Sequence, residues 1–479
     1  MSNEQQPNDR TKGIPTIIQG GMGVGVSNWR LARAVGECGQ MGVVSGTALD
    51  SVFVRRLQLG DPEGAVRRAL AHFPWPGMAR RALEAYWVEG GIAPGTPFKT
   101  VPMTTAELTR TQTELLVMAN FCEVFLAREG NSAPVGINYL EKVQLPTLPS
   151  LLGAMLAGVD AILMGGGIPL AIPGILDRLA RWEPVEKRLE VVGSGVHGQH
   201  LAPAELAEGA LTPLQRPAFL AIVSSDVVAK ALLRRASGAV DGFIVENHTA
   251  GGHNAPPRRA PQAEGNGASA FGPKDVPDLA GIRALERPFW LAGGYGSPED
   301  LRAALAEGAR GIQAGTVFAC CRESGLAPHL KEALLRHSLA GEIEIITDLR
   351  ASPTGYPFKL APLPEAPAGH GPVDAARRRV CDLGYLRTIY EREDGSLGYR
   401  CPAEPVAAYL AKGGALEDTV GRRCLCNGLA AAIGFGQARR QGVEPPMVTA
   451  GEQLRALRQL VAEKGLDYTA RDVIEYLES

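Results

Sequence analysis

Short apolar runs rich in valine and isoleucine recur along most of the chain, and many end in glycine, serine or asparagine ahead of an amphipathic segment. This alternation indicates repeated βα units. The runs are continuously apolar, which is typical of parallel strands that are buried on both faces. We expect eight strands, at residues 14–19, 42–45, 135–139, 161–164, 220–224, 242–246, 289–292 and 311–313.

A series of eight βα units either closes into a barrel or forms an open, doubly wound sheet. Glycine-rich ends on the last three strands favour closure, because the loops at this end of a barrel bind ligands. The predicted fold class is therefore α/β, a (β/α)8 TIM barrel with a helical insertion after strand 2 and a helical C-terminal extension.

Two segments interrupt the series of strands. Residues 51–131 are too many for an ordinary βα loop and predict a helical insertion that caps the barrel mouth. Residues 189–216 form a second insertion, in which 189–193 is a candidate strand outside the barrel. The barrel domain is expected over 14–350, and residues 351–479 are expected to form a mainly helical extension packed against it.

The composition is that of a globular protein, with 45% apolar and 21% charged residues. The 49 basic residues nearly balance the 51 acidic ones, so no field of one sign is available to attract nucleic acid or an anionic membrane. The first residues are polar and lack the apolar core of a signal peptide, which predicts a cytoplasmic protein. The apolar stretch at 150–176 contains Asp160 and two prolines, so we expect a helix followed by a buried strand there instead of a membrane span.

The segment 246–254, Glu-Asn-His-Thr-Ala-Gly-Gly-His-Asn, directly follows a predicted strand. The C-terminal ends of barrel strands are where active sites lie, so Glu246 and His253 are candidates for chemistry. The paired glycines Gly251 and Gly252 let backbone amides approach an anion closely, and a histidine can move a proton near neutral pH. The alternative is a structural loop whose imidazoles satisfy backbone groups.

Two further glycine-containing turns follow the seventh and eighth predicted strands. Loops at these two places form the usual phosphate site of a barrel, where backbone amides bind a dianion. Each turn alone also fits a steric requirement at a strand end, but the pair in this order predicts a phosphate group. The residues are Gly293 and Gly294 in the first turn, and Gln313, Gly315 and Thr316 in the second.

A glycine-rich run at 19–25 ends the first predicted strand. The run lacks the spacing of a dinucleotide-binding fingerprint, and no acidic residue ends the second strand, so a Rossmann interpretation fits poorly. A backbone surface for a flat ring, at Gly21 and Met22, fits better. Asn138 ends the third strand, where its amide either contacts ring or ribose atoms or serves as a turn residue.

Together these motifs resemble the nitronate monooxygenase family, also called 2-nitropropane dioxygenases, and its relatives, the FMN-dependent enoyl-acyl carrier protein reductases. The resemblance runs from about Ile14 to Ser324, and its most specific pieces are 250–253 and 315–316. It implies a TIM barrel with FMN at the C-terminal ends of the strands. Carried over by position, it implies flavin contacts at Asn138, Gly251, Gly294, Gln313, Gly315 and Thr316, with Gly21 and Met22 beside the ring.

His253 matches the histidine that the family places near the flavin, where it would act as a general base on a carbon acid, or as a proton donor in the reductases. It is the predicted catalytic residue. The family commonly has glutamine where this chain has Glu246, and a carboxylate there would disfavour an anionic flavin ring. We therefore expect Glu246 to be protonated or paired, or the flavin to be tuned differently. Glu246, Gly252 and Gly293 complete the predicted cofactor contacts.

Four of the eight cysteines lie in the C-terminal extension. Four thiols can hold zinc or an iron-sulfur cluster, but the spacing is not a paired C-x-x-C pattern. Buried thiols that line a packing surface are the expected interpretation, and no metal site is predicted. The residues are Cys381, Cys401, Cys424 and Cys426.

Three functions follow from these features. The first is an FMN-dependent monooxygenase that oxidises alkyl nitronates or similar carbon acids with dioxygen and needs no nicotinamide. The second is an enoyl reductase, in which NAD(P)H reduces FMN and the insertion and extension form an acyl tunnel or a surface for an acyl carrier protein. The third is a non-catalytic barrel, against which the polar residues at several strand ends argue. The sequence leaves the physiological substrate and the oligomeric state open, a homodimer included.

Overall fold

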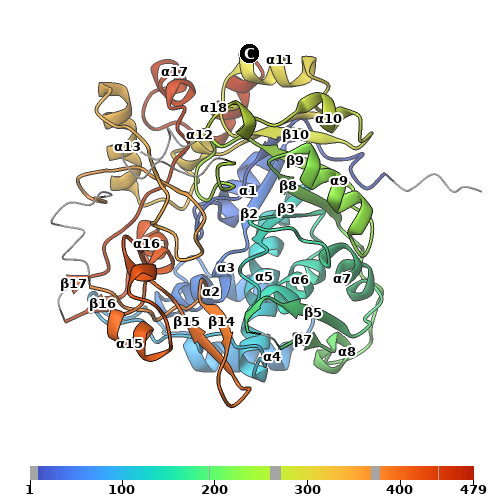
Figure 1. Ribbon diagram of the computed structural model, residues 1–479, viewed down its shortest axis with the longest axis vertical. Helices are drawn as coiled ribbons and strands as arrows, with labels where there is room; N and C mark the ends of the chain where they lie inside the picture. Colours follow the sequence, from blue (N-terminus) through green and yellow to red (C-terminus); the bar gives the residue numbers. More distant parts are fainter. Residues whose placement is uncertain (1–8, 194, 259–270, 368–377, 441) are drawn as a thin grey trace, which may run out of the picture.

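The computed structural model describes residues 9–193, 195–258, 271–367, 378–440 and 442–479. Eight strands form a closed barrel in the order β1-β11-β10-β9-β8-β4-β3-β2, and all neighbouring strands are parallel. The predicted TIM barrel is thus confirmed (Figure 1). The strands are β1 (Ile17–Gln19), β2 (Met41–Ser45), β3 (Val135–Leu140), β4 (Ala161–Gly165), β8 (Ala218–Val223), β9 (Gly242–Glu246), β10 (Phe289–Ala292) and β11 (Gly311–Ala314).

The barrel strands separate two hydrophobic clusters. Successive side chains of a strand point to opposite faces, so Ile162 packs outward against the helices while Leu163 packs into the barrel. Trp290 fills the interior, and its indole Nε1 donates a hydrogen bond to the Pro15 carbonyl at 2.9 Å. This burial on both faces explains why the strands are continuously apolar in sequence.

The insertion after β2 is helical, as predicted. It contains α2 (Leu49–Gln58), α3 (Ala65–Ala71), α4 (Pro76–Tyr86) and α5 (Arg110–Arg128). The expectation that the whole insertion caps the barrel mouth is wrong for α5, which packs on β2, β3, α1 (Trp29–Gly36) and α6 (Thr147–Leu156). This helix is therefore the crossover helix between β2 and β3, because its buried side chains need the outer face of the sheet.

The second insertion contains strands outside the barrel, as expected near 189–193. β5 (Val185–Leu189) pairs antiparallel with β7 (His197–Leu201). The short β6 (Val191–Val192) pairs with β14 (Thr388–Glu391), which in turn pairs with β15 (Leu397–Arg400). This sheet ties the second insertion to the C-terminal region.

The C-terminal region is helical, and it also carries short strands. In Figure 1 its orange and red elements lie along one side of the barrel and over one end of it. α13 (Pro328–Ala340) and β12 (Ile346–Asp348) precede this region. Its remaining elements are β13 (Phe358–Leu360), α15 (Val406–Ala411), α16 (Leu425–Ala432), β16 (Ala438–Arg439), β17 (Gly442–Val443), α17 (Arg455–Lys464) and α18 (Ala470–Leu477).

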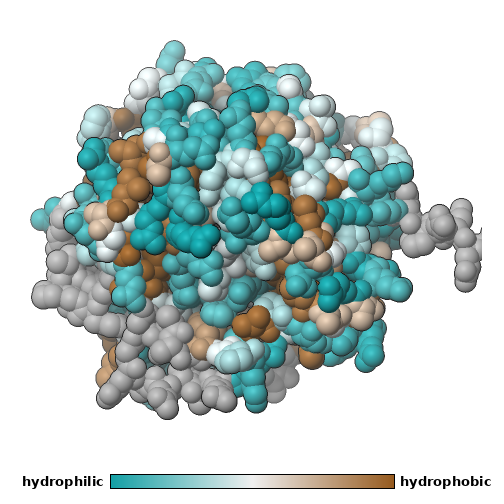
Figure 2. Space-filling model, turned by 90° about the horizontal axis from the view of Figure 1, so that it is seen from above, coloured by the Kyte–Doolittle hydropathy of each residue, from teal (hydrophilic) through white to brown (hydrophobic). Residues whose placement is uncertain are grey.

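The apolar stretch at 150–176 contains the end of α6, strand β4 and part of α7 (Ile172–Leu179), so the prediction of a helix followed by a strand is confirmed. No helix in the described part of the chain combines the length and the apolar character needed to cross a bilayer. Hydrophilic residues cover most of the face shown in Figure 2, and its hydrophobic residues form small separate patches. The remaining helices are α8 (Pro203–Leu206), α9 (Asp226–Arg235), α10 (Leu279–Arg283), α11 (Pro298–Ala306) and α12 (Thr316–Ala319).

Candidate active site

A cavity of about 270 Å³ lies at the C-terminal ends of the barrel strands. The strand ends form one wall, and side chains from the C-terminal region form much of the other. Every residue that the sequence assigns to the site lines this one cavity, although contact with a cofactor stays a prediction. These residues are Gly21, Met22, Asn138, Glu246, Gly251, Gly252, His253, Gly293, Gly294, Gln313, Gly315 and Thr316.

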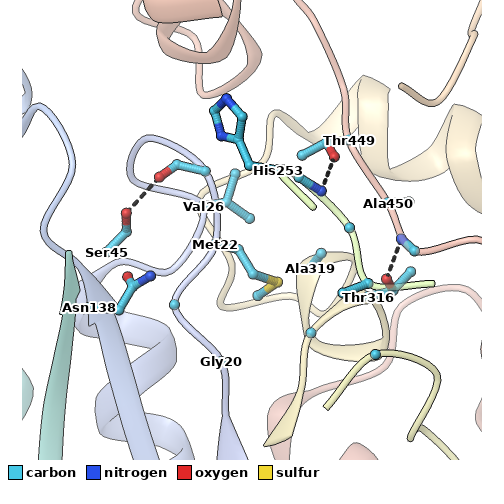
Figure 3. A pocket seen from close by; sticks show the side chains of 18 of the residues that line it. Gly20, Met22, Val26, Ser45, Asn138, His253, Thr316, Ala319, Thr449 and Ala450 are labelled. Atoms are coloured by element: carbon cyan, nitrogen blue, oxygen red, sulfur yellow. Dashed lines mark hydrogen bonds between the residues drawn. The ribbon is translucent and has the colours of Figure 1, made fainter. Parts of the chain in front are cut away.

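Hydrogen bonds with the side chains of Ser27 and Ser45 hold the backbone of the turn after β1 in place. Ser27 Oγ accepts a hydrogen bond from Met22 N at 2.9 Å, and Ser45 Oγ donates to the Gly23 carbonyl (Figure 3). A Cβ atom on Gly21 would lie 2.0 Å from Asn138 Oδ1, so only glycine permits this approach. The bare backbone of Gly21 and the amide of Asn138 therefore lie side by side at the cavity wall.

Two amide oxygens at the cavity have no partner within the described residues. Asn138 Oδ1 and Gln313 Oε1 are both buried, and neither forms a hydrogen bond with any part of the chain that the structure describes. Buried polar atoms in folded proteins are almost always hydrogen-bonded. Both residues line the cavity, so a ligand with N–H or O–H groups would satisfy them.

The turns after β10 and β11 form a second backbone surface. Gly293 and Gly294 have φ angles of +81° and +94°, which disfavour any residue with a side chain. A Cβ on Gly293 would lie 2.6 Å from the Asn247 carbonyl oxygen. Next to this turn, Thr316 Oγ1 accepts a hydrogen bond from Gly451 N at 2.9 Å (Figure 3). Peptide groups at these turns are thus free of side chains and suited to an anionic group.

The C-terminal region clamps the loop that carries His253. Gly252 N donates to Thr449 Oγ1 at 2.8 Å (Figure 3). Lys359 N donates to the Gly252 carbonyl at 2.8 Å. A Cβ on Gly251 would lie 2.9 Å from the Ala450 carbonyl carbon, so this close approach requires glycine. The sequence analysis missed Thr449 and Lys359. The only local signal is the short apolar run at 447–448 that precedes Thr449.

His253 is held by side chains from the same region. Its Nε2 lies 2.7 Å from Ser352 Oγ, and its ring meets the Phe358 ring edge-on at 4.8 Å between centroids. Burial lowers the pKa of His253 well below its ordinary value, and the positive charge of Lys142 lowers the pKa further. The imidazole is therefore neutral at neutral pH and able to accept a proton.

Glu246 ends β9, and the charge of Lys142, a residue that the sequence analysis missed, affects its pKa. Burial raises the pKa of Glu246 to about 7, against the attraction of Lys142. Burial lowers the pKa of Lys142 to about 7, against the attraction of Glu246. The Lys142 Nζ atom lies 3.7 Å from the centre of the Tyr356 ring. The signal for Lys142 was its place two residues beyond the end of β3.

The four C-terminal cysteines are reduced, and Cys426 lines the cavity. Burial raises the pKa of all four, so they are protonated thiols at neutral pH. Among the described residues, no group of three or more histidine, cysteine, aspartate or glutamate side chains is arranged to hold a metal ion.

Part of this chain matches a known protein family in sequence. Residues 200–353 match the sequence model of the nitronate monooxygenase family. No curated protein sequence matches the chain.

Similar solved structures share less than a fifth of their residues with the chain. A nitroalkane oxidase from Streptomyces ansochromogenes is 18% identical over 98% of this chain and 96% of its own, with a TM-score of 0.49. FabK from Thermotoga maritima is 16% identical over 98% and 93%, with a TM-score of 0.47. The enoyl reductase domain of MlnA, from the macrolactin biosynthesis cluster of Bacillus amyloliquefaciens, is 14% identical over 98% and 95%, with a TM-score of 0.46.

The segment matched by the family model contains three of the features that form the cavity. It includes the loop from Glu246 to His253 and the two glycine turns at 293–294 and 315–316. Over residues 200–353, the resemblance to the nitronate monooxygenase family is thereby confirmed.

Proposed function

We propose that this chain is an FMN-dependent oxidoreductase that oxidises alkyl nitronates or similar small carbon acids with dioxygen. The observation that carries the proposal is the convergence, in one cavity, of two unpartnered amide oxygens, bare glycine turns and one neutral imidazole. The match to the nitronate monooxygenase family over the same loops supports it.

The residues present fit FMN. The oxygens of Asn138 and Gln313 lack donors that ring N–H or ribityl O–H groups would supply. Gly21 offers a backbone surface without a side chain for a flat ring, and Met22 lines the cavity beside it. The turns at 293–294 and 315–316 leave peptide groups exposed for a phosphate.

Bound FMN would supply the redox chemistry, taking electrons from the carbon acid and passing them to dioxygen. The chain's own task is to position the substrate and move a proton. When Nε2 of His253 carries a proton and donates it to Ser352 Oγ, Nδ1 is the basic atom that accepts the proton of the carbon acid. Ser352 is thus a positioning residue for the imidazole, and Phe358 packs against the ring.

A second function, NAD(P)H-dependent enoyl reduction on an acyl chain, is favoured by one specific observation. The wall of the cavity that comes from the C-terminal region is apolar, with Leu425, Leu429 and Met447 among its residues. A small nitronate does not need this apolar wall, whereas a hydrocarbon chain would bury surface against it.

An air-free experiment separates the two functions. The purified protein is loaded with FMN and mixed either with propionate-3-nitronate or with NADPH, and the flavin absorbance is followed. We expect bleaching by the nitronate and none by NADPH. Bleaching by NADPH alone would replace the oxygenase with the reductase, and bleaching by neither would remove both.

A further inference from the structure

The apolar part of the cavity lies beside His253. The Phe358 ring, which meets the His253 ring edge-on, lines the cavity and belongs to a hydrophobic cluster that also contains Leu425. In the view of Figure 3, Met22 lies between the His253 ring and Gly20, which follows β1. The apolar side chains therefore begin where a substrate must lie to reach the imidazole.

Three residues of this apolar part are half-buried. Leu140, Cys426 and Leu429 line the cavity and pack against the same hydrophobic cluster, but they do not belong to its buried core. Leu140 ends β3, whereas Cys426 and Leu429 lie one turn apart on α16, so the barrel and the C-terminal region both bound the cavity here. Apolar surface of this kind gains free energy when an apolar ligand covers it.

The polar groups in this part of the cavity are uncharged. The Tyr385 hydroxyl lies 2.8 Å from Ser51 Oγ and also donates a hydrogen bond to Asp50 Oδ1. Burial raises the pKa of Tyr385 well above its ordinary value and raises the pKa of Cys426 to about 12, so both groups are protonated at neutral pH. Neither group offers a charge to a ligand.

The lining near His253 does not suit an anionic tail. Among the described residues that line the cavity, none is a lysine or arginine, and Glu246 is the one acidic residue. The ammonium of Lys142 is buried and lies outside this described lining. The peptide groups suited to a phosphate belong to other turns, at 293–294 and 315–316. A carboxylate in the apolar part would lose its hydration without gaining a cation, which is costly.

We propose that the substrate is an uncharged carbon acid with an apolar tail, and that this tail lies between Leu140 and α16 while the acidic carbon faces His253. The inference rests on the proposed function and narrows its substrate class. Nitroalkanes with an alkyl tail fit this description, whereas nitro compounds that end in a carboxylate do not. The apolar wall is thereby assigned to the oxidation itself.

Two compounds of the same shape test the proposal. 3-Methyl-1-nitrobutane and 3-nitropropionate differ only in the tail, which is an isopropyl group in the first and a carboxylate in the second. Binding is measured calorimetrically with FMN-loaded His253→Ala, in which turnover does not obscure it. We expect the neutral compound to bind roughly tenfold or more tightly than the anion. Equal affinity, tighter binding of the anion, or no binding of either compound overturns the proposal.

A cation introduced into the apolar part provides a sharper test. Leu429→Arg should shift the preference toward 3-nitropropionate by roughly tenfold or more, because it supplies the missing counter-charge. Leu416→Arg makes the same change at a leucine that is 58% exposed in the same region, and it should leave the preference unchanged. Leu429→Gln keeps the size and adds no charge, so it should weaken binding of the neutral compound alone. An unchanged preference in both Leu429 variants, with folding verified by circular dichroism, overturns the proposal.

Turnover tests the tail in the natural FMN-loaded enzyme. From nitroethane through 1-nitropropane and 1-nitrobutane to 1-nitropentane, kcat/KM from oxygen uptake should rise by roughly two- to fourfold per methylene. A flat or falling series overturns the tail site even when oxidation proceeds. No oxygen uptake with any compound, while the binding preference persists, contradicts the proposed function instead. If FMN does not bind, the proposed function fails, and the preference is measured on the protein as purified, so the two failures are distinguishable.

Discussion

At the scale of single residues, His253 owes its role to two effects that act in the same direction. Burial and the positive charge of Lys142 both lower the pKa of its imidazole, so the ring is neutral at the pH of a cell and keeps a lone pair that can accept a proton. Ser352 fixes the ring through Nε2, which sets the orientation of the basic atom. A histidine without both features would be partly charged and free to turn.

Replacing His253 by alanine should therefore remove the base and leave the cavity. We expect His253→Ala to retain FMN and to lose roughly 10²–10⁴-fold in kcat/KM with a neutral nitroalkane, the carbon acid whose proton the imidazole takes. The control is His200→Ala, because His200 is exposed on β7. Ordinary turnover in His253→Ala, measured by oxygen uptake, would contradict the role of the imidazole.

The raised pKa of Glu246 predicts how stability changes with pH. Because its pKa in the folded chain, about 7, lies above the ordinary 4.5, the proton-bound form stabilises the fold at low pH, and that stability is lost as pH rises from 4.5 through 7. Glu246→Gln has no titrating carboxyl at this position, so its stability does not fall in this way as pH rises. Its stability relative to the natural chain should increase by about 3 kcal/mol at most between pH 5 and pH 7.5. Thermal melting of both proteins across this range tests the prediction, and a constant difference in melting temperature would contradict it.

At the scale of elements, the barrel strands were predictable because each is a continuous apolar run that ends at a glycine or polar residue. The observed bounds of β9 and β10 equal the predicted ones. The function of α5 was not predictable from its length, because only packing reveals that it is a crossover helix. The pairing of β6 with β14 was also hidden, since the two strands are short and lie almost 200 residues apart.

The residues of the candidate site also fall into two groups: those that the sequence could predict and those that it could not. Residues on strand ends, such as Asn138 and Gln313, could be predicted because the fold class places all strand ends together. Ser352 and Thr449 could not, because they come from loops of the C-terminal region whose contacts with the 250–253 loop form only in the folded chain. Lys142 lies beyond a strand end, and its significance depends on burial, which the sequence does not reveal.

The hydrogen bond from Gly252 N to Thr449 Oγ1 should make a measurable contribution to stability. Thr449→Val keeps the shape but removes the acceptor for Gly252 N, so a partly buried N–H loses its partner. We expect a loss of about 1–3 kcal/mol in the free energy of unfolding, together with weaker FMN binding. The exposed Thr96→Val is the matched control. Unchanged stability and unchanged FMN affinity in Thr449→Val would show that the clamp does not support the loop.

At the scale of the whole molecule, the cavity is built by two parts of the chain. The barrel contributes the strand ends, and the C-terminal region contributes the opposite wall together with the residues that hold His253. A second hydrophobic cluster joins the two parts, with Val24 and Val52 on the barrel side and Tyr385, Leu425 and Met447 on the other. The C-terminal region is therefore a component of the site itself.

The central claim, that FMN binds at the strand ends, is tested most directly by flavin titration of two glycine variants. A Cβ on Gly21 would collide with the Asn138 amide, whereas a Cβ on Gly13 would meet nothing within 4 Å. Flavin fluorescence quenching should show binding of one FMN per chain to the natural protein and to Gly13→Ala, and much weaker binding to Gly21→Ala. No binding by the natural protein, or equal binding by both variants, would contradict the account.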